Sequence, residues 1–437
     1  MANNSLRREL RTLGAVMLGL GSMIGTGVFV SLGLAAGLAG PAVVLAVPLA
    51  GALALCNGLS SAQLAARFPV AGGTYEYAHR VGWAPFGLLA GVMFLIAKSA
   101  SAATAVLALA AYLLEPFVGV GGLMIPAALA LLVMLTVVVL EGLRRTNTVN
   151  TVIVAVTLLG LAVFVAVSLP RLEPDQLRFD LSRVSSDAAA GSPAPSIGWP
   201  DLLHAAALAF VAYTGYGRIA TLGEEVSEPR RTIPRAILLT VLLCIVVYAA
   251  VALAAVGLAG PSRFAELARG GAPLQALAES AGFPRWSLWA ITAAAVTAML
   301  GVVLNLLLGL SRVALAMARR RHLPHLFARI DAKTATPGPA VVLVAVVIAL
   351  LAIAGSIRAA WSLSAVTVLI YYAITNAAAL RLPPDARLYP RIISWIGLIG
   401  CLGLAAFIEP IYWVAAAALI ALTLVWHLAT RRHTAQP

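Results

Sequence analysis

The stretch Gly21-Ser22-Met23-Ile24-Gly25-Thr26-Gly27 lies inside an apolar run over residues 13–37. The run is longer than the roughly 20 residues that a helix needs to cross a bilayer. Glycines at three of seven positions weaken a helix, and each unpaired backbone group in hydrocarbon costs several kcal/mol. Such an interruption is tolerated where the backbone lines a cavity or meets a ligand. The stretch therefore predicts a broken membrane-spanning helix with a binding site at the break.

The composition of the chain predicts an all-α polytopic membrane protein. Of the 437 residues, 61% are hydrophobic and 11% are charged, against roughly 25% charged residues in soluble domains. The apolar runs lack alternation of period two, which excludes an outer-membrane barrel. Twelve transmembrane helices are predicted, at about 13–37, 40–64, 83–114, 123–140, 149–168, 200–222, 236–258, 285–318, 339–355, 361–380, 392–408 and 411–428.

The net charge of +13 is distributed as a topology signal. With the N-terminus inside, 20 of the 30 basic residues fall on the cytoplasmic side, 7 fall outside and 3 lie within spans. This is the positive-inside pattern. It predicts an inner (plasma) membrane protein with both termini in the cytoplasm. Its basic loops meet membrane lipid, and no nucleic acid partner is expected.

A second interruption, Tyr213-Thr214-Gly215-Tyr216-Gly217, falls in the predicted sixth span at 200–222. It follows the first interruption by five spans. The unusually long spans 83–114 and 285–318 are also five apart. Because five is odd, the second copy enters the membrane from the opposite side, which predicts a 5+5 inverted repeat. The copies cover 13–168 and 200–380, with two additional spans in 389–428 of a single transmembrane domain, 1–437.

The two interruptions present opposite ends of the backbone dipole. The outer half of the first span begins near Gly25–Gly27 with N–H groups that suit a carboxylate. The outer half of the sixth span ends near Phe210–Tyr213 with carbonyls that suit an ammonium group. Together they predict a clamp for a zwitterion. The alternative is that the glycines only allow close helix packing, but two interruptions at matching repeat positions favour a transport site.

At these residues the chain resembles the amino acid–polyamine–organocation permeases. Gly21 to Phe29 resembles their first-span motif, and Phe210 to Tyr216 resembles their sixth span. The resemblance covers spans 1 to 10 and is closest to the branch of cationic amino acid transporters and their bacterial relatives. Further matches are Phe68-Pro69 with Gly72-Gly73-Thr74-Tyr75, Glu224-Glu225 followed by Pro229 to Pro234, Leu304-Asn305 to Arg312, and Tyr371 to Asn376.

The resemblance implies a leucine-transporter-type fold that holds an amino acid at the broken helices 1 and 6. By match to the motifs, the carboxylate would contact Met23, Thr26 and Gly27, and the amine would contact Val211, Ala212 and Thr214. The predicted substrate-binding residues are Ser22, Met23, Ile24, Gly25, Thr26, Gly27, Lys98, Phe210, Val211, Ala212, Tyr213 and Thr214. The predicted gating residues are Tyr213, Tyr216 and Arg218.

Lys98 is the predicted coupling residue. It lies about 15 residues into the third span, roughly 22 Å along the helix, and is one of two lysines in the chain. Ionisable residues at this depth are costly and mark substrate or proton pathways. Burial penalises the charged form of a lysine, so a lysine can exchange a proton where an arginine cannot. The alternative is a structural lysine that donates to carbonyls of the broken helices.

Proton-dependent relatives often carry a lysine in span 5, and the aligned position here is Thr157. The absence of that lysine favours a coupling role for Lys98. Arg218 is expected either to act at an inner gate or to pair with a loop carboxylate such as Glu76. His204 is expected at the wet outer interface. Cys56, Cys244 and Cys401 lie in apolar runs and are expected to be small buried hydrophobes without a disulfide or metal.

The sequence thus predicts a secondary active transporter that imports neutral amino acids with protons by alternating access. No metal set or nucleophile–base pair lies at one depth of the spans, so an enzyme is not expected, and no cofactor is expected. Two alternatives stay open: an exchanger of cationic amino acids or polyamines, and a sensor that binds amino acids without moving them.

Overall fold

A computed structural model describes residues 11–68, 72–115, 122–142, 147–178, 198–220, 226, 228–331, 333–334, 336–354 and 356–434. Pro69 and the Glu224-Glu225 pair lie outside these residues. The regular elements of the described part are helices. Their bounds are α1 Thr12–Met23, η1 Gly27–Ser31, α2 Leu32–Ala39, η2 Gly40–Ala42, α3 Val43–Arg67, α4 Thr74–Arg80, α5 Ala84–Leu114, α6 Met124–Leu140, α7 Asn147–Ser168, η3 Leu169–Arg171, η4 Pro174–Leu177, α8 Trp199–Tyr213, η6 Thr214–Tyr216, α9 Gly217–Ala220, α10 Pro229–Arg269, α11 Pro273–Ser280, α12 Arg285–Arg319, η7 His325–Ala328, α13 Gly338–Ile353, α14 Ile357–Leu380, η8 Pro384–Ala386, α15 Arg391–Ala405 and α16 Pro410–Thr434.

Six helical segments of the described part are long and apolar enough to cross a bilayer. The first of these, Thr12–Arg67, contains the predicted spans 1 and 2. Helices α15 and α16 pass the same test as one pair bent by 119°, and α6 and α13 are shorter apolar helices. The all-helical architecture is therefore as predicted, whereas the twelve transmembrane helices and the inverted repeat stay predictions.

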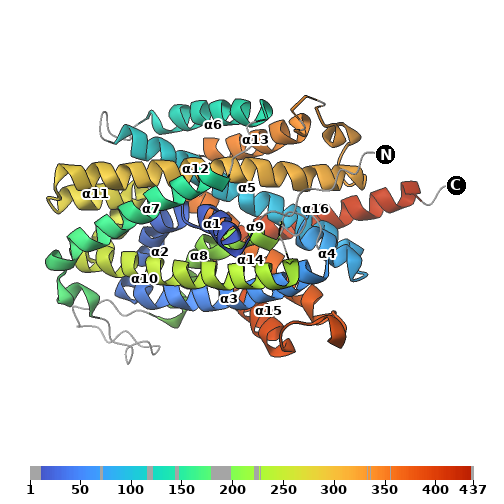
Figure 1. Cartoon of the computed structure of the whole chain (residues 1–437), viewed down its shortest axis with the longest axis horizontal. Coiled ribbons are helices and arrows are strands. Elements are labelled where there is room, and N and C mark those ends of the chain that lie inside the picture. The colour runs from blue at the N-terminus through green and yellow to red at the C-terminus, as the bar shows by residue number, and fades with distance from the viewer. Residues whose placement is uncertain are drawn as a thin grey trace.

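The longest helices run side by side along the long axis of the molecule (Figure 1). Helix α5 packs against α12 and α14, and α3 packs against α8 and α10. The broken segments lie between these helices, where α1 contacts η6 and α9, and α2 contacts α8. The long helices thus enclose the two interruptions.

The segment 259–284, which falls between the predicted spans 236–258 and 285–318, is mostly helical. Helix α10 continues across a kink, where Gly260 has φ +77° and precedes Pro261. Proline disfavours a helical conformation in the residue before it, and glycine accepts the positive φ. Helix α11 follows and packs against α10 and α12. Figure 1 shows α11 and α4 at opposite ends of the bundle.

Helix α15 attaches to the bundle through buried polar contacts that an apolar pattern does not reveal. The amide of Asn57 donates to Cys401 Sγ over 3.2 Å, and Asn376 donates to Asn57 over 2.5 Å. The hydroxyls of Ser60 and Ser394 lie 2.8 Å apart. Hydrogen bonds between polar side chains hold helices together in a bilayer, where apolar contacts alone carry no hydrophobic driving force.

Candidate substrate-binding site

The first broken helix ends inside the glycine-rich stretch. Helix α1 stops at Met23, and Ile24 is extended with φ −79° and ψ 104°. The chain resumes as the π-helix η1, a rare form that is frequent at functional sites. The carbonyl of Met23 accepts a hydrogen bond from the Tyr248 hydroxyl over 2.7 Å. A backbone carbonyl that the break leaves without a helical partner is therefore paired.

The backbone of the second broken helix forms a tighter 3₁₀ turn at its break, whereas that of the first becomes extended. Helix α8 ends at Tyr213, and the next residues form the 3₁₀ turn η6. The Thr214 hydroxyl donates to the carbonyl of Val211 over 2.6 Å. The carbonyl of Ala212 lies 3.3 Å from the Tyr248 hydroxyl, the same group that contacts Met23. Tyr248 of α10 therefore joins the two breaks.

The two interruptions touch each other. A Cβ added at Gly27 would overlap the Cβ of Ala212, and a Cβ added at Gly215 would overlap the carbonyl of Ser22. At Gly25 it would lie 2.5 Å from a methyl group of Val302 in α12. The glycines thus serve the close packing that the sequence analysis treats as the alternative. Close packing does not exclude a binding site, because a cavity lies directly beside this contact.

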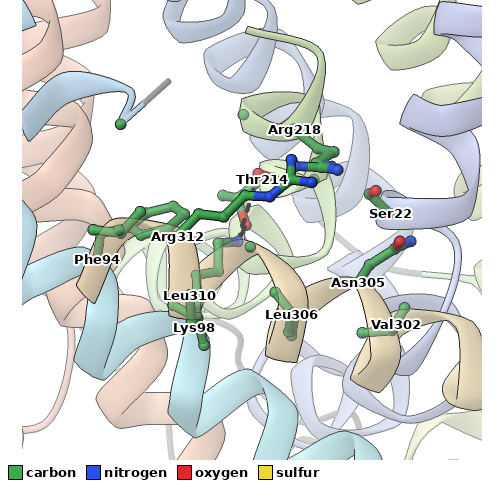
Figure 2. Close-up of a pocket in the computed structure, with 15 residues that line it drawn as sticks. Ser22, Phe94, Lys98, Thr214, Arg218, Val302, Asn305, Leu306, Leu310 and Arg312 are labelled. Atoms are coloured by element: carbon green, nitrogen blue, oxygen red, sulfur yellow. Dashed lines mark hydrogen bonds between the residues drawn. The ribbon is translucent and has the colours of Figure 1, made fainter. Parts of the chain in front are cut away.

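The cavity lies beside the two breaks, between them and helices α5 and α12. It has an empty volume of about 730 Å³, its open mouth included. Figure 2 shows Lys98 of α5 directed at Thr214, with Arg218 and Arg312 on the same side of the cavity. The residues that line it are Ser22, Gly72, Phe94, Lys98, Thr214, Gly215, Gly217, Arg218, Val302, Asn305, Leu306, Gly309, Leu310, Arg312 and Val313.

Lys98 and Thr214 form the central polar contact of the cavity. The Lys98 amine donates to the Thr214 hydroxyl over 2.5 Å and lies 3.5 Å from the Thr214 carbonyl. That carbonyl also accepts from the Tyr372 hydroxyl over 3.2 Å. Lys98 is buried, with 6% of its surface exposed. The lysine therefore donates to the broken sixth span, a contact that is compatible with both the coupling and the structural interpretation of its position.

The charges around the cavity are positive. Lys98, Arg218 and Arg312 line it, and none of its described lining residues is an aspartate or a glutamate. Glu76, the example of a loop carboxylate expected to pair with Arg218, instead receives two hydrogen bonds from Arg320, of 2.9 and 2.7 Å, so that example was wrong. Such a two-fold contact satisfies the planar guanidinium and carboxylate groups together.

Helix α4 connects to three neighbouring elements near Glu76. The hydroxyl of Thr74 lies 2.7 Å from that of Thr375 in α14. The Tyr77 hydroxyl donates to the carbonyl of Ala220 in α9 over 3.0 Å. With the Glu76–Arg320 pair at the end of α12, these contacts fix the position of α4 beside the end of the cavity that Gly72 lines.

His204, near the start of α8, was expected in a wet environment, and this was wrong. Its side chain is only 11% exposed, and its Nε2 atom lies 3.2 Å from a carboxylate oxygen of Glu409. Arg358 donates to the other oxygen of Glu409 over 2.9 Å. The start of α8 is therefore joined electrostatically to the start of α14 and to the turn between α15 and α16.

The structure brings four of the predicted site residues to the cavity wall: Ser22, Lys98, Thr214 and Arg218. The other predicted residues lie outside that wall, in and next to the contact between the two breaks: Met23, Ile24, Gly25, Thr26, Gly27, Phe210, Val211, Ala212, Tyr213 and Tyr216. The Tyr213 hydroxyl donates to the carbonyl of Val47 over 3.1 Å.

One wall of the cavity was not predicted from the sequence. Phe94, Val302, Asn305 and Arg312 line it, and the last three lie on α12. Asn305 also donates to the carbonyl of Gly21 over 3.3 Å, which ties α12 to the first break. The segment from Leu304 to Arg312 does match the family pattern, and this was the signal available for it. Tyr248 and Tyr372, which contact the breaks, were not predicted as binding residues.

Comparison with known proteins decides the family. A family model described as amino acid permease matches residues 10–433, nearly the whole chain. The chain belongs to the amino acid permease family. It is a membrane transporter rather than an enzyme, as predicted from the sequence, and membership of the family implies that its small-molecule substrate is an amino acid.

Three relatives of this permease match it over more than half of their own length. It is 41% identical to an uncharacterized transporter of Mycobacterium tuberculosis, over 95% of this chain and 90% of that one. It is 31% identical to the chloroplastic cationic amino acid transporter 9 of Arabidopsis thaliana, over 75% and 58% of the two chains. It is 25% identical to the branched-chain amino acid permease BcaP of Bacillus subtilis, over 76% and 72%.

Proposed function

We propose that this permease imports neutral amino acids together with protons by alternating access, as a leucine-transporter-type inverted repeat in the inner (plasma) membrane. The observation that carries the proposal is the cavity beside two broken helices that touch each other. Free backbone polar groups at membrane depth are tolerated where they line such a cavity. Discontinuous helices of this kind form the substrate sites of many secondary transporters.

The wall of the cavity supports a neutral substrate. Phe94, Val302, Leu306 and Leu310 offer apolar surface to a side chain. In the cavity wall, the carbonyl and hydroxyl of Thr214 are acceptors for the ammonium group. The N–H groups at the start of η1, which suit a carboxylate, lie behind that wall, in the contact between the two breaks. The wall itself would hold the ammonium group at Thr214 and the side chain against α12.

We expect neutral amino acids to bind more tightly than arginine or lysine. A cationic side chain would enter a cavity lined by Lys98, Arg218 and Arg312. Unlike a neutral one, it would meet like charge at low dielectric, at a cost on the order of several kcal/mol if unpaired. Calorimetric titration of the purified permease with alanine, leucine, glutamate, arginine and lysine measures the order. Arginine binding more tightly than alanine and leucine would contradict the proposal.

The second candidate function is exchange of cationic amino acids. It rests on relatives such as the cationic amino acid transporter 9 of Arabidopsis thaliana. The same titration separates the two candidates, because a cationic exchanger must bind arginine or lysine with the higher affinity.

The conformation supports a site that opens toward the cytoplasm. Arg312, Val313 and Gly72 line one end of the cavity, and Gly72 lies next to the start of α4. Away from this opening, hydrogen bonds join α5 and α14 to the two broken spans. The Tyr112 hydroxyl at the end of α5 donates to the carbonyl of Phe29 in η1 over 3.2 Å, and Trp361 near the start of α14 donates to that of Leu208 in α8 over 2.9 Å. On the predicted topology, this is an inward-facing arrangement.

We expect both termini in the cytoplasm and the segment between α7 and α8 outside. Cysteines introduced as Ser192→Cys and Thr434→Cys, in a chain whose three native cysteines are replaced, test this with an impermeant thiol reagent on intact cells. Ser192→Cys should label without permeabilisation, and Thr434→Cys should label only after it. The basic-residue asymmetry is the physical reason. The reverse pattern would overturn the orientation.

A further inference from the structure

The acceptors proposed for the substrate's ammonium group already have a cationic neighbour in this conformation. The Lys98 amine lies 2.5 Å from the hydroxyl and 3.5 Å from the carbonyl of Thr214. The hydroxyl directs its single proton to the carbonyl of Val211, so it presents only a lone pair to Lys98. The Tyr372 hydroxyl lies within hydrogen-bond distance of the Thr214 carbonyl. Thr214 thus has little acceptor capacity left for a second amine.

We propose that Lys98 is a tethered competitor of the substrate: in this conformation its side-chain amine occupies the place of the substrate's ammonium group on Thr214. The inference rests on the proposed function and adds a role to one residue of the site. Binding of an amino acid then requires that Lys98 leave Thr214 or lose its charge. Lys98 lowers the affinity of the inward-opening site for an amine and so promotes release of the substrate to the cytoplasm.

The charges nearby favour competition over sharing. Two ammonium groups on one residue would repel each other in a site shielded from water. Arg218 and Arg312 line the same cavity, and none of its described lining residues supplies a carboxylate between the two amines. The long, unbranched lysine side chain can withdraw along α5 by rotation about its four side-chain bonds. Displacement of Lys98 is therefore a defined step of substrate binding.

Competition predicts a dependence on the ligand that a structural hydrogen bond does not. A ligand with both a carboxylate and an ammonium group competes with Lys98. The same ligand with hydrogen in place of the ammonium group does not compete. Removing the positive charge at position 98 should tighten binding of the first ligand and should not tighten that of the second, which gains no acceptor and loses a nearby positive charge. If Lys98 only stabilised the fold, its removal would affect both ligands in the same direction.

The experiment uses the full-length permease purified in detergent. Binding of leucine and of its desamino analogue, 4-methylpentanoate, is measured for the wild type, Lys98→Met and Lys98→Gln. The glutamine variant keeps a neutral donor toward Thr214, so it serves where the methionine variant does not fold. The exposed Lys333→Met is the matched control, since it removes the only other lysine from a loop. Thermal unfolding of each variant is recorded alongside.

The expected result is that leucine binds roughly 5- to 150-fold more tightly to both Lys98 variants, the usual range for coupling between two sites. The affinity for 4-methylpentanoate should not rise in either variant, and Lys333→Met should match the wild type. Unchanged or weaker leucine binding in folded Lys98 variants would overturn the competitor role while leaving the proposed function intact. If none of the amino acids titrated above (alanine, leucine, glutamate, arginine and lysine) binds to the wild type or to any variant, the proposed function and the competitor role fail together.

Discussion

Lys98→Met is expected to abolish accumulation of substrate driven by a proton gradient, while substrate exchange across the membrane continues. Lys98 lies at the broken sixth span and donates to Thr214. A lysine in this position can bind a proton in one conformation of the transporter and release it in the other, which is what coupling requires. Methionine keeps the length of the side chain and removes the titrating amine.

The measurement is uptake of a labelled neutral amino acid into liposomes at several external pH values. Wild type should concentrate the substrate, with uptake that rises as the external pH falls. Lys98→Met should only equilibrate it, with a flat pH profile. Lys333→Met is the control and should behave as wild type. An unchanged pH profile and full accumulation in Lys98→Met would show that the lysine is structural and that coupling lies elsewhere.

Gly27→Ala should separate the two broken helices and prevent substrate binding. A Cβ at position 27 would overlap the Cβ of Ala212 and lie 2.7 Å from its Cα. Neither atom belongs to a flexible side chain, so the backbone itself must move. Overpacking of this kind costs about 1–3 kcal/mol. Thermal unfolding in detergent and calorimetric binding measure the loss.

The double variant Gly27→Ala with Ala212→Gly provides a rescue, since it removes one of the overlapping methyl groups. It should regain part of the lost stability and binding. The matched control is Gly403→Ala in α15, where a Cβ meets nothing within 4 Å and a helical alanine is favoured over glycine by about 0.5–1 kcal/mol. Wild-type binding and stability in Gly27→Ala would contradict the packing of the two breaks.

The positions of the breaks could be predicted because glycine acts locally. A glycine-rich stretch weakens a helix whatever surrounds it, so the end of α1 at Met23 and the turn η6 at Thr214 follow from the chain itself. The position of Lys98 along its helix was predictable for a similar reason, since its distance from the start of α5 is fixed by the rise per residue.

The partners of the breaks could not be predicted, because they depend on how distant helices are rotated. Tyr248 lies 225 residues from Met23 along the chain, and nothing in its own segment indicates which face of α10 meets the breaks. Arg312 lines the cavity, and its own segment does not indicate this. Arg320 replaces Arg218 as the partner of Glu76 because the end of α12 lies against α4. The helical part of 259–284 was hidden by its polar residues, which lie on the last part of α10 and on the short helix α11.

The most direct test of the account is flux of labelled amino acids through the purified permease in liposomes with an inward proton gradient. The account predicts uptake of neutral amino acids above their equilibrium level, collapse of that accumulation when the gradient is dissipated, and little uptake of arginine or lysine. Binding of amino acids without any flux would contradict the account and leave a sensor; uptake of arginine in exchange for internal lysine, with no response to the gradient, would contradict it in favour of a cationic exchanger.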